Sequence, residues 1–561
     1  MRVYRWWLLW GLGVVALIVM TVLPARARAG VLTSDDQVQL LYTNRFEFDR
    51  RGIPFIRVMV AEGRRRAELS CPSAMVVLPN GRSGASIRGG RRWEVSVLRG
   101  KAARIRYWTV METRVGMDPV WTAARVKRYQ ADGLKVRVFQ VGSVFAVSGT
   151  MVDNRKTLVA VQPKRSYRSA QRTSSRLARK YGVRTALHAE LVSRSHGWIV
   201  ARDRDTGVVI RNEGMMWFSP VGPGTITVHH IEYAKGYAWH GFADRRYWGM
   251  VYAAVDRNGF LAVVNAVPAD RLLAGLVPAE MYASAPMAAL RAQAVAARGQ
   301  LLVKIGMRHL ADPYLMCASQ HCQVYAGAGK EQARSTRAIR DTRGLVLVDE
   351  HGHLADTVFH AVCGGHTESN SNVWRTVPRR HLEGVSDVIP VRGRSTGWAS
   401  HLVATDLRTW VLHPPRTYCQ EALGKRRAGL FRWRVRKSFK SLSRTLGRRL
   451  AVGRVTGLSV LHRGRSGRAL AILVKGTTGR AKVSGELKIR QLLGNLKSTM
   501  FIVAPYNDAS GRPAGLLFIG GGWGHGVGMC QMGAIGRAMH GIAFRQILGH
   551  YYPHTKLIRL Y

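Results

Sequence analysis

Alternation of apolar and polar residues from residue 31 to about 245 is the feature that most limits how this chain can fold. Segments such as 55–60 and 93–98 alternate with a period of two, and glycine-containing turns such as 79–81 and 89–90 separate them. Successive side chains of a β-strand point to opposite faces, so the pattern predicts short strands rather than helices. We therefore expect a β-rich N-terminal region over residues 30–130.

One polar, arginine-rich stretch, 166–181, breaks this pattern with a helical one. It lies between strand-like segments, including 134–145 and 198–209, so an inserted αβ module is expected over residues 131–246. The strand that begins at Val138 and the helix after it resemble the sporulation-related repeat, a fold that binds denuded glycan. An ordinary αβ insertion is the alternative.

From residue 247 the chain changes character. Residues 252–267 alternate like a hairpin whose turn, 256–259, contains Asn-Gly, a pair suited to left-handed torsion angles. Pro278-Ala279-Glu280-Met281 follows, and then an alanine-rich helix to Ile305, with Ser284 as N-cap and Pro286 in its first turn. Alanine on both faces of that helix predicts tight packing. The expected fold class is thus α+β, with a mixed α/β domain around a central cleft at 247–561.

The chain carries a formal charge of +53 over its 561 residues. So basic a surface attracts anions, which could be nucleic acid, anionic lipid or an acidic polymer. An acidic medium, in which carboxylates bring little solubility, is another reason for such a balance. The densest basic cluster, 425–449, has Phe431, Trp433 and Phe439 between its charges, and is either a solvated face or a polyanion-binding surface.

The N-terminus indicates export. Arg2 and Arg5 precede an apolar run over 6–23, and small residues alternate with arginine up to Ala29. This is the pattern of a secretory signal over 1–29, cleaved after Ala29, although the run is long enough to remain as a membrane anchor. We therefore expect a protein of the periplasm, cell envelope or extracellular space that touches membrane only through this segment. Export argues against a nucleic-acid partner.

Two polar, glycine-containing segments could carry chemistry. The loop 520–528 has no Gly-Lys-Ser/Thr after it and no acidic residue about twenty positions on, so it is not a nucleotide-binding loop. Its glycines instead indicate close backbone approach around Trp523 and His525. The stretch 359–374 is a polar turn after a strand, a place where binding groups often collect.

These segments and one more occur in the order of a known family. The matching motifs are 277–281 (VPAEM) with 288–298 (AALRAQAVAAR), 366–370 (HTESN), 522–529 (GWGHGVGM) with 531–534 (QMGA), and 547–553 (ILGHYYP). They resemble the stage II sporulation protein D family, to which the LytB-type amidase enhancers also belong. The similarity begins near residue 55, is interrupted by the insertion and is strongest over 247–561.

The resemblance implies a lytic transglycosylase that cuts glycan strands stripped of stem peptides, with Glu280 as catalytic residue and no cofactor needed for catalysis. One carboxyl suffices because the sugar's own 6-hydroxyl is the nucleophile: the acid protonates the glycosidic oxygen and recovers a proton from the hydroxyl. Such a group must be protonated near the working pH, which a partly apolar site can arrange. The alternative for Glu280 is a first-turn acid that complements a helix dipole.

By the same resemblance, a set of polar and aromatic residues lines the substrate cleft: Thr367, Glu368, Ser369, Trp523, His525 and Gln531. We expect His525 to orient the sugar or Glu280, and Trp523 to shape a subsite. The sequence departs from the family at Cys530, where serine is usual, so the role of that position is open.

Cysteine and histidine residues suggest a structural zinc ion near the cleft. Cys317, His321 and Cys322 are closely spaced, and Cys363 or His366 could complete a tetrahedral set. Some family members bind zinc near this position. The alternative is a disulfide, because an exported chain meets oxidising conditions.

The expected partners are peptidoglycan glycan strands and, as an addition, a cell-wall amidase. A denuded strand exposes lactyl carboxylates, so a basic cleft would attract it. Two other classes of function compete: a non-catalytic wall-binding amidase enhancer, and a basic structural protein that grips anionic wall or lipid.

Overall fold

The computed structural model describes residues 34–44, 47–79, 81, 85–147, 150–234, 240–319, 321–374, 376–390 and 406–561. The expected signal or anchor at 1–29 and Asn80 of the expected turn 79–81 lie outside these ranges. Among the helices in these ranges, none is both long and apolar enough to cross a membrane. The mixed α+β class predicted from the sequence is confirmed.

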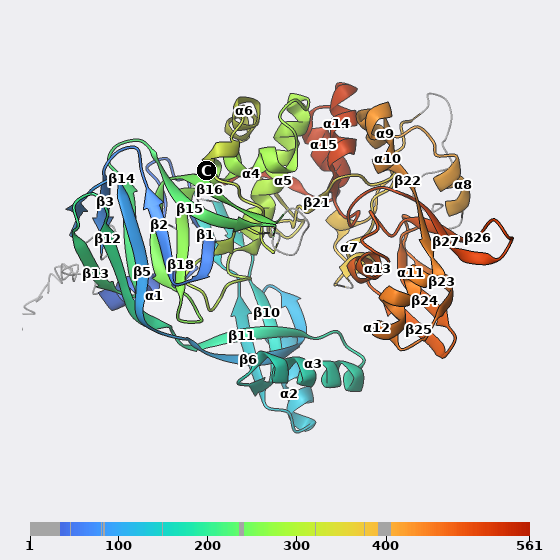
Figure 1. The fold of residues 1–561 in the computed structure, drawn as a ribbon, viewed down its shortest axis with the longest axis horizontal. Helices are drawn as coiled ribbons and strands as arrows, with labels where there is room; N and C mark the ends of the chain where they lie inside the picture. Colours follow the sequence, from blue (N-terminus) through green and yellow to red (C-terminus); the bar gives the residue numbers. More distant parts are fainter. Residues whose placement is uncertain are drawn as a thin grey trace, which may run out of the picture.

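The N-terminal half is built on two facing sheets that share one hydrophobic core (Figure 1). The first has the order β19 (Met316–Cys317), β1 (Phe55–Arg64), β18 (Leu261–Pro268), β17 (Met250–Val255), β14 (Met215–Pro220), β3 (Met75–Leu78) and β4 (Ile87–Arg88). The second has the order β13 (Val209–Glu213), β12 (His196–Asp203), β5 (Arg92–Lys101), β2 (Arg66–Ser70), β15 (Thr225–Tyr233) and β16 (Gly241–Trp248). Alternate residues of β5 and β12, such as Trp93 and Ile199, are buried in this core, as period-two alternation predicts.

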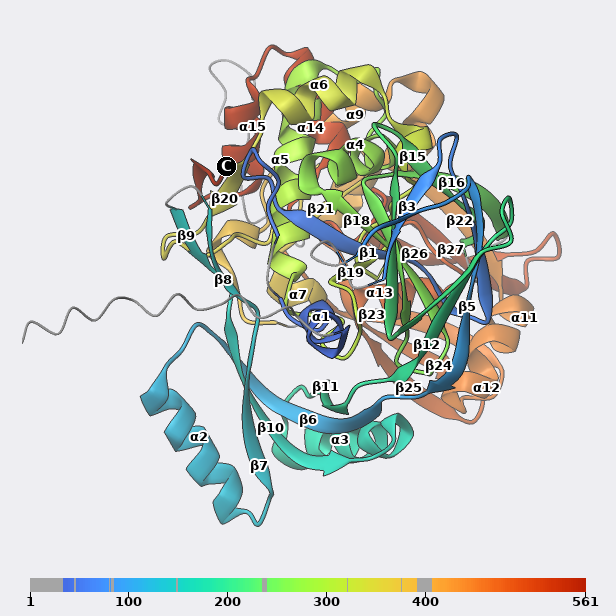
Figure 2. The ribbon, with the colours of Figure 1, turned by 90° about the vertical axis from the view of Figure 1, so that its left-hand side faces the viewer.

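An αβ module projects from these sheets and lies at the bottom of Figure 2. Its antiparallel sheet has the order β11 (Ala186–Ser193), β6 (Arg104–Val115), β10 (Lys156–Lys164) and β7 (Val136–Val141), with helices α2 (Pro119–Ala131) and α3 (Tyr167–Tyr181) and a small hairpin of β8 (Val144–Val147) and β9 (Thr150–Asp153). The chain order β6-α2-β7-β10-α3-β11 is a split βαβ arrangement. Helix α3 begins after Ser166 as expected, whereas α2, capped by Asp118, was not expected.

The module occupies residues 104–193, and the strands after it pair with strands of the N-terminal sheets. The αβ insertion expected from the sequence covers residues 131–246. That interval includes β12 to β16, which belong to the two large sheets. The division of the chain into domains remains a prediction.

Helices α4 (Ala269–Glu280) and α5 (Met287–Lys304) follow the hairpin of β17 and β18, which forms as predicted. Ser284 was expected to cap α5, and this is wrong: the helix starts after Pro286, which is the N-cap residue. A residue before proline is disfavoured in helical torsions, so α5 cannot extend back past Pro286 to a cap at Ser284.

Helix α5 is buried on nearly all sides. It packs against α4, α6 (Ala333–Asp341), α14 (Gln531–Met539), α15 (Phe544–Tyr551) and β20 (Leu345–Val348). Small side chains allow this packing: at Gly299 an added Cβ would come within 2.5 Å of Thr357 Oγ1. The C-terminal strand β29 (Lys556–Arg559) returns to pair with β20, so the end of the chain covers the centre of the molecule.

The C-terminal lobe, orange to red in Figure 1, contains two three-stranded sheets. They are β22 (Arg432–Ser438), β27 (Pro513–Gly521) and β26 (Phe501–Asn507), and β23 (Val455–Arg463), β24 (Ala469–Gly476) and β25 (Gly479–Ser484), with α13 (Glu486–Leu492) beside β24. Within the basic cluster 425–449, Phe431 and Trp433 are core residues, and Trp433 Nε1 donates a hydrogen bond to Gly522 O at 3.0 Å. These aromatic residues therefore support the fold rather than an exposed binding surface.

Candidate functional site

Glu280 is the last residue of α4, and its side chain is partly buried. Its neighbours Val277 and Met281 are buried in apolar clusters with residues of α5. Burial raises the pKa of the Glu280 carboxyl, and the positive charge of Lys304 opposes that rise. The negative end of the α4 dipole also disfavours a carboxylate at this position. The alternative role for Glu280, a first-turn acid that complements a helix dipole, is therefore wrong.

Gln531 links the Glu280 backbone to the segment that follows the glycine-rich loop. Its Nε2 donates to Glu280 O at 2.9 Å and to Gln293 Oε1 of α5 at 3.4 Å. Gln531 is the first residue of α14 and comes directly after β28 (Met529–Cys530), which pairs in parallel with β21 (Phe359–His360). The backbone of Glu280 is thus fixed against the segment that directly follows the loop motif 522–529.

The glycine-rich loop 522–528 approaches a buried arginine, Arg468, at one of its glycines. At Gly526, with φ of +86°, an added Cβ would lie 2.4 Å from Arg468 Cζ. At Gly528, with φ of +69°, it would lie 2.1 Å from Val358 O. Only glycine combines such left-handed torsions with so close an approach. The expectation of close backbone approach in this loop is met at both positions.

Both ring nitrogens of His525 bond to the backbone. Nε2 donates to Phe359 O at 3.1 Å, and Nδ1 accepts from Val527 N at 3.0 Å. Burial and the nearby positive charge of Arg468 lower the pKa of His525 to about 4, so the ring is neutral near pH 7. In this geometry His525 fixes the loop and has no ring nitrogen left for a sugar. Its ring lies 5.1 Å from that of Trp374, measured between centroids.

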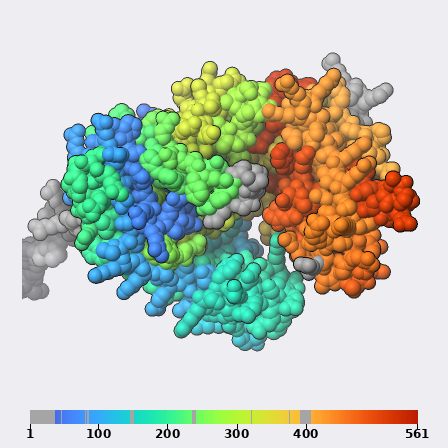
Figure 3. All heavy atoms as spheres, in the orientation of Figure 1, coloured from blue at the N-terminus to red at the C-terminus, as the bar shows by residue number. Residues whose placement is uncertain are grey.

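Trp523 is the most exposed of the expected cleft residues, with 44% of its surface accessible. Its backbone is fixed by two hydrogen bonds with Val362, of 3.0 and 2.8 Å. An exposed indole on a fixed backbone suits stacking against a sugar ring. Figure 3 shows the molecular surface recessed between the blue-to-green half of the molecule and its orange-to-red half.

Thr367 and Glu368 are buried and form hydrogen bonds within the protein. The Glu368 carboxylate accepts hydrogen bonds from Ser369 N, Asn372 Nδ2 and both the N–H and the hydroxyl of Ser466. Thr367 Oγ1 accepts from Val385 N at 2.7 Å. Ser369 is partly buried and accepts from Gly384 N at 3.2 Å. These three residues hold the turn 366–370 in place, and a direct contact of theirs with substrate remains a prediction.

A second group of side chains forms a candidate metal centre. His309, Cys317, His321 and Cys322 each offer a ligand atom, and these atoms all lie within 4.8 Å of one another. His309 Nε2 is 3.2 Å from Cys322 Sγ, and His321 Nδ1 is 3.6 Å from both sulfurs. Tetrahedral zinc, with bonds of about 2.0–2.3 Å, separates its nitrogen and sulfur ligands by about 3.5 Å. The residues present therefore fit a Cys₂His₂ zinc ion.

Surrounding groups orient these ligands. His309 Nδ1 bonds to Asp312 Oδ2 at 2.9 Å, which leaves Nε2 to face the sulfurs, as in many carboxylate–histidine–zinc arrangements. Lys304, the last residue of α5, donates from Nζ to Cys322 O. Since Lys304 also acts on the pKa of Glu280, the metal centre and the carboxyl lie in one electrostatic environment.

Three of these four residues were expected from the sequence, and the structure brings them together, while metal binding by them remains a prediction. Cys317, His321 and Cys322 lie together, whereas Cys363, expected as the fourth, is wrong because it belongs to a separate buried cluster. His366, the other candidate, is also absent from this group. The observed fourth member, His309, lies eight positions before Cys317, and no known ligand spacing indicates it.

We expect zinc removal to destabilise the protein. Treatment with a strong chelator under reducing conditions, or a Cys317→Ser change, should lower the thermal unfolding midpoint, because free energy of metal binding is free energy of folding. Metal content measured by plasma mass spectrometry should fall in parallel. Cys71→Ser is the control, since Cys71 is buried, belongs to no group of candidate ligands in the described part of the chain and has its Sγ 3.3 Å from Ser73 Oγ. An air-oxidised Cys317–Cys322 disulfide in a metal-free, fully stable protein would contradict the zinc assignment.

Comparisons with known proteins agree with the motifs. Residues 257–348 match the family described as Stage II sporulation protein, and residues 368–528 match a Domain of unknown function (DUF8618). The chain is 27% identical over 305 residues to an uncharacterized protein of Brachyspira hyodysenteriae, covering 54% of this chain and 70% of the relative. It is 28% identical over 301 residues to the amidase enhancer of Bacillus subtilis, covering 51% of this chain and only 40% of that protein.

Proposed function

Because the chain contains a stage II sporulation protein domain over residues 257–348, we propose that it is an exported lytic transglycosylase of peptidoglycan with Glu280 as acid/base. One observation carries the proposal: burial at the end of α4 raises the pKa of this carboxyl, and Gln531 fixes its backbone beside the glycine-rich loop. An acid held neutral near the working pH is what protonation of a glycosidic oxygen requires. Cells would export the chain to the envelope, and the N-terminal segment 1–29 would direct it there.

The proposed reaction needs no water. The Glu280 carboxyl gives its proton to the oxygen between MurNAc and GlcNAc, and the bond from that oxygen to the MurNAc anomeric carbon breaks. The muramic 6-hydroxyl then attacks the anomeric carbon and passes its proton to the Glu280 carboxylate. This leaves a 1,6-anhydro-muramic end and restores the acid, so one carboxyl serves both steps.

Positive charge on the chain supports a denuded strand as the substrate. Without stem peptides, the lactyl carboxylates make the strand a polyanion, and a protein with a charge of +53 attracts it over a distance set by the salt concentration. Trp523 would offer a face for stacking against a sugar, and Ser369 and Gln531 polar atoms near it. Thr367, Glu368 and His525 would position these groups rather than touch the strand.

The test of this proposal is the identity of the product. The purified full chain is incubated with glycan strands from which an amidase has removed the stem peptides, and soluble fragments are analysed by mass spectrometry. We expect fragments without stem peptides that end in 1,6-anhydro-muramic acid. Because no water is added, each should be about 18 mass units lighter than the corresponding product of hydrolysis. Reducing-end products without the anhydro bridge would contradict it.

The pH dependence should follow the Glu280 carboxyl. The acid form is the active one, so activity is present below its raised pKa and is lost as the pH rises through it. The alkaline limb of a kcat/KM profile should therefore lie above the ordinary pKa range of glutamate. Because Lys304 lowers this pKa, Lys304→Met should move the limb to higher pH. A profile with no alkaline limb, or one that Lys304→Met moves to lower pH, would contradict the assignment.

The second candidate function is a non-catalytic amidase enhancer. The similarity to the Bacillus subtilis protein of that name favours it, although the match spans 40% of that protein. In that case the chain would increase the release of stem peptides by a cell-wall amidase while leaving purified denuded strands intact. Assays of both reactions on the same preparation separate the two functions.

A further inference from the structure

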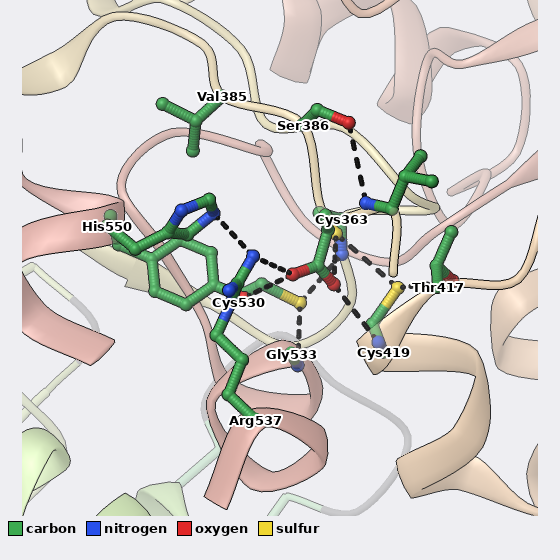
Figure 4. Close-up of polar contacts among 12 residues, drawn as sticks. Cys363, Val385, Ser386, Thr417, Cys419, Cys530, Gly533, Arg537 and His550 are labelled. Carbon is green, nitrogen blue, oxygen red and sulfur yellow. Dashed lines mark hydrogen bonds and ion pairs between the residues drawn. The ribbon is translucent and has the colours of Figure 1, made fainter. Parts of the chain in front are cut away.

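A second cluster of ligating side chains lies in the C-terminal half, and all four of its members are fully buried. They come from segments far apart in sequence: Cys363 after β21, Asp387 in a loop, Cys419 in α9 (Tyr418–Leu423) and Cys530 at the N-cap of α14. Figure 4 shows the side chains converging between these elements. Their ligand atoms all lie within 4.8 Å of one another, and the cluster shares no residue with His309, Cys317, His321 and Cys322.

The distances suit one metal ion. Cys363 Sγ is 3.5 Å from Cys419 Sγ and 3.6 Å from Asp387 Oδ2. Two thiolates bound to one tetrahedral zinc ion, with bonds of about 2.3 Å, lie about 3.8 Å apart. A cubane iron–sulfur cluster would hold its cysteine sulfurs farther apart than the 4.8 Å limit found here. Three thiolates and a carboxylate are also ligand types that zinc accepts.

Backbone N–H groups point at the sulfurs as they do around bound thiolates. Cys530 Sγ accepts from Cys363 N at 3.1 Å and from Gly533 N at 3.2 Å, and Cys363 Sγ accepts from Gly365 N at 3.3 Å. The Asp387 carboxylate is held as well. Its Oδ1 accepts from the Tyr551 hydroxyl at 2.7 Å and its Oδ2 from Cys419 N at 3.0 Å. Such outer contacts orient metal ligands.

Arginine side chains surround the cluster. Arg537 lies 3.4 Å from Asp387 Oδ1, Arg468 donates to Cys363 O at 2.9 Å, and Arg432 donates to Gly364 O at 3.1 Å. Burying cations is costly unless anions offset them. A zinc ion with three thiolates and one carboxylate carries a net charge of about −2. Thiolates bound to zinc would therefore supply negative charge beside these guanidinium groups. Neutral thiols would leave the guanidinium groups with few anions nearby.

We propose that Cys363, Asp387, Cys419 and Cys530 form a second, structural zinc site. The ion would tie together the turn after β21, the loop at 387, α9 and the start of α14. Cys530 directly precedes Gln531, so the site would also fix the residue that holds the Glu280 backbone. This role does not depend on the proposed enzymatic activity.

The competing structure is a Cys363–Cys419 disulfide, since those sulfurs are already close. A disulfide uses two of the three thiols and gives Cys530 and Asp387 no part. It also removes the thiolate charge beside the arginines. Zinc accounts for all four side chains, and so the geometry favours it.

Metal stoichiometry in the full chain tests the proposal. Protein reconstituted with zinc under reducing conditions and freed of excess metal should contain two zinc ions per chain by plasma mass spectrometry. Cys530→Ser should retain one, because serine can keep the cap hydrogen bond to Gly533 N while losing the thiolate. Cys317→Ser should also retain one zinc ion, because it removes the ion held by His309, Cys317, His321 and Cys322. Cys71→Ser should retain two.

A cobalt spectrum on the unaltered chain covers the case in which a variant fails to fold. With both sites filled by cobalt, the intensity of sulfur-to-metal charge transfer should correspond to five thiolates per chain, three of them from this cluster. One zinc ion per chain, lost in Cys317→Ser and unaffected in Cys530→Ser, would overturn the proposal. A Cys363–Cys419 disulfide found by peptide mapping of reconstituted protein would overturn it as well.

Discussion

Replacing Glu280 with glutamine is expected to slow the formation of 1,6-anhydro-muramic ends by about 10²–10⁴-fold, the usual contribution of a general acid. The amide has the same size and keeps the contacts of the side chain with its apolar neighbours. It cannot deliver a proton to the glycosidic oxygen or take one from the 6-hydroxyl. The measurement is the initial rate of anhydro-end formation on denuded strands, compared at equal protein concentration with the unaltered chain.

Glu331→Gln is the matched control. Burial also raises the pKa of Glu331, and this residue belongs to the same matched stretch, 257–348, but it pairs with Arg271 at 3.9 Å. Its amide should leave the rate within about twofold, since it has no part in proton transfer. If Glu280→Gln and Glu331→Gln both kept the rate of the unaltered chain, Glu280 would not be the acid/base. If the unaltered chain formed no anhydro ends, the amidase enhancer would remain. Unchanged thermal midpoints in both variants would show that folding is not the cause.

Arg468→Met is expected to lower the free energy of unfolding by about 3–5 kcal/mol, the cost of removing one partner from a buried charged network. Arg468 is fully buried and donates to Cys363 O, His366 O and Ser466 Oγ. Methionine would leave these acceptors without a donor and would leave the Glu368 carboxylate without its nearby positive charge. The loop 522–528, which packs against the guanidinium at Gly526, would also lose that contact. Urea unfolding followed by tryptophan fluorescence measures the change.

Arg465→Met provides the comparison for this measurement. Arg465 lies on the same turn, but its side chain is 44% exposed and its ion pair with Glu383 is 3.9 Å long. An exposed pair of this kind contributes about 0–1 kcal/mol. If both substitutions lower the free energy of unfolding by the same small amount, the buried Arg468 does not stabilise the loop 522–528.

The sequence predicted elements with strong local signals. The hairpin of β17 and β18 has an Asn-Gly turn, and α3 has a serine cap. Helix α4 was not predicted, because Pro278 in its last turn is a residue that usually marks the end of a helix. Proline at this position removes one helical hydrogen bond to the preceding turn, and α4 ends two residues later, at Glu280. The helix cap at Ser284 failed for the related reason that Pro286 overrides it.

The sequence could name the candidate site residues, but it could not predict which hydrogen bonds they form. Motifs located Glu280, Trp523 and His525, since residue types and order are properties of the sequence. Which partner each polar atom takes depends on contacts between distant segments, such as Glu368 with Ser466. The same holds for the metal ligands. His309 stands in the group where Cys363 was expected, because the tertiary structure brings the segment of His309 beside the other three residues. Spacing along the sequence does not contain that information.

The position of α5 has a consequence for how the chain is made. This helix lies within residues 257–348, yet α14 and α15, from the last part of the chain, cover it, and β29 completes the strand pair beside it. On a ribosome these covering segments emerge after α5. The apolar faces of α5 that they cover therefore stay accessible until those segments have been made, and the centre of the molecule can close only after that. A polypeptide that remains open this long can still be threaded through a translocon before it folds.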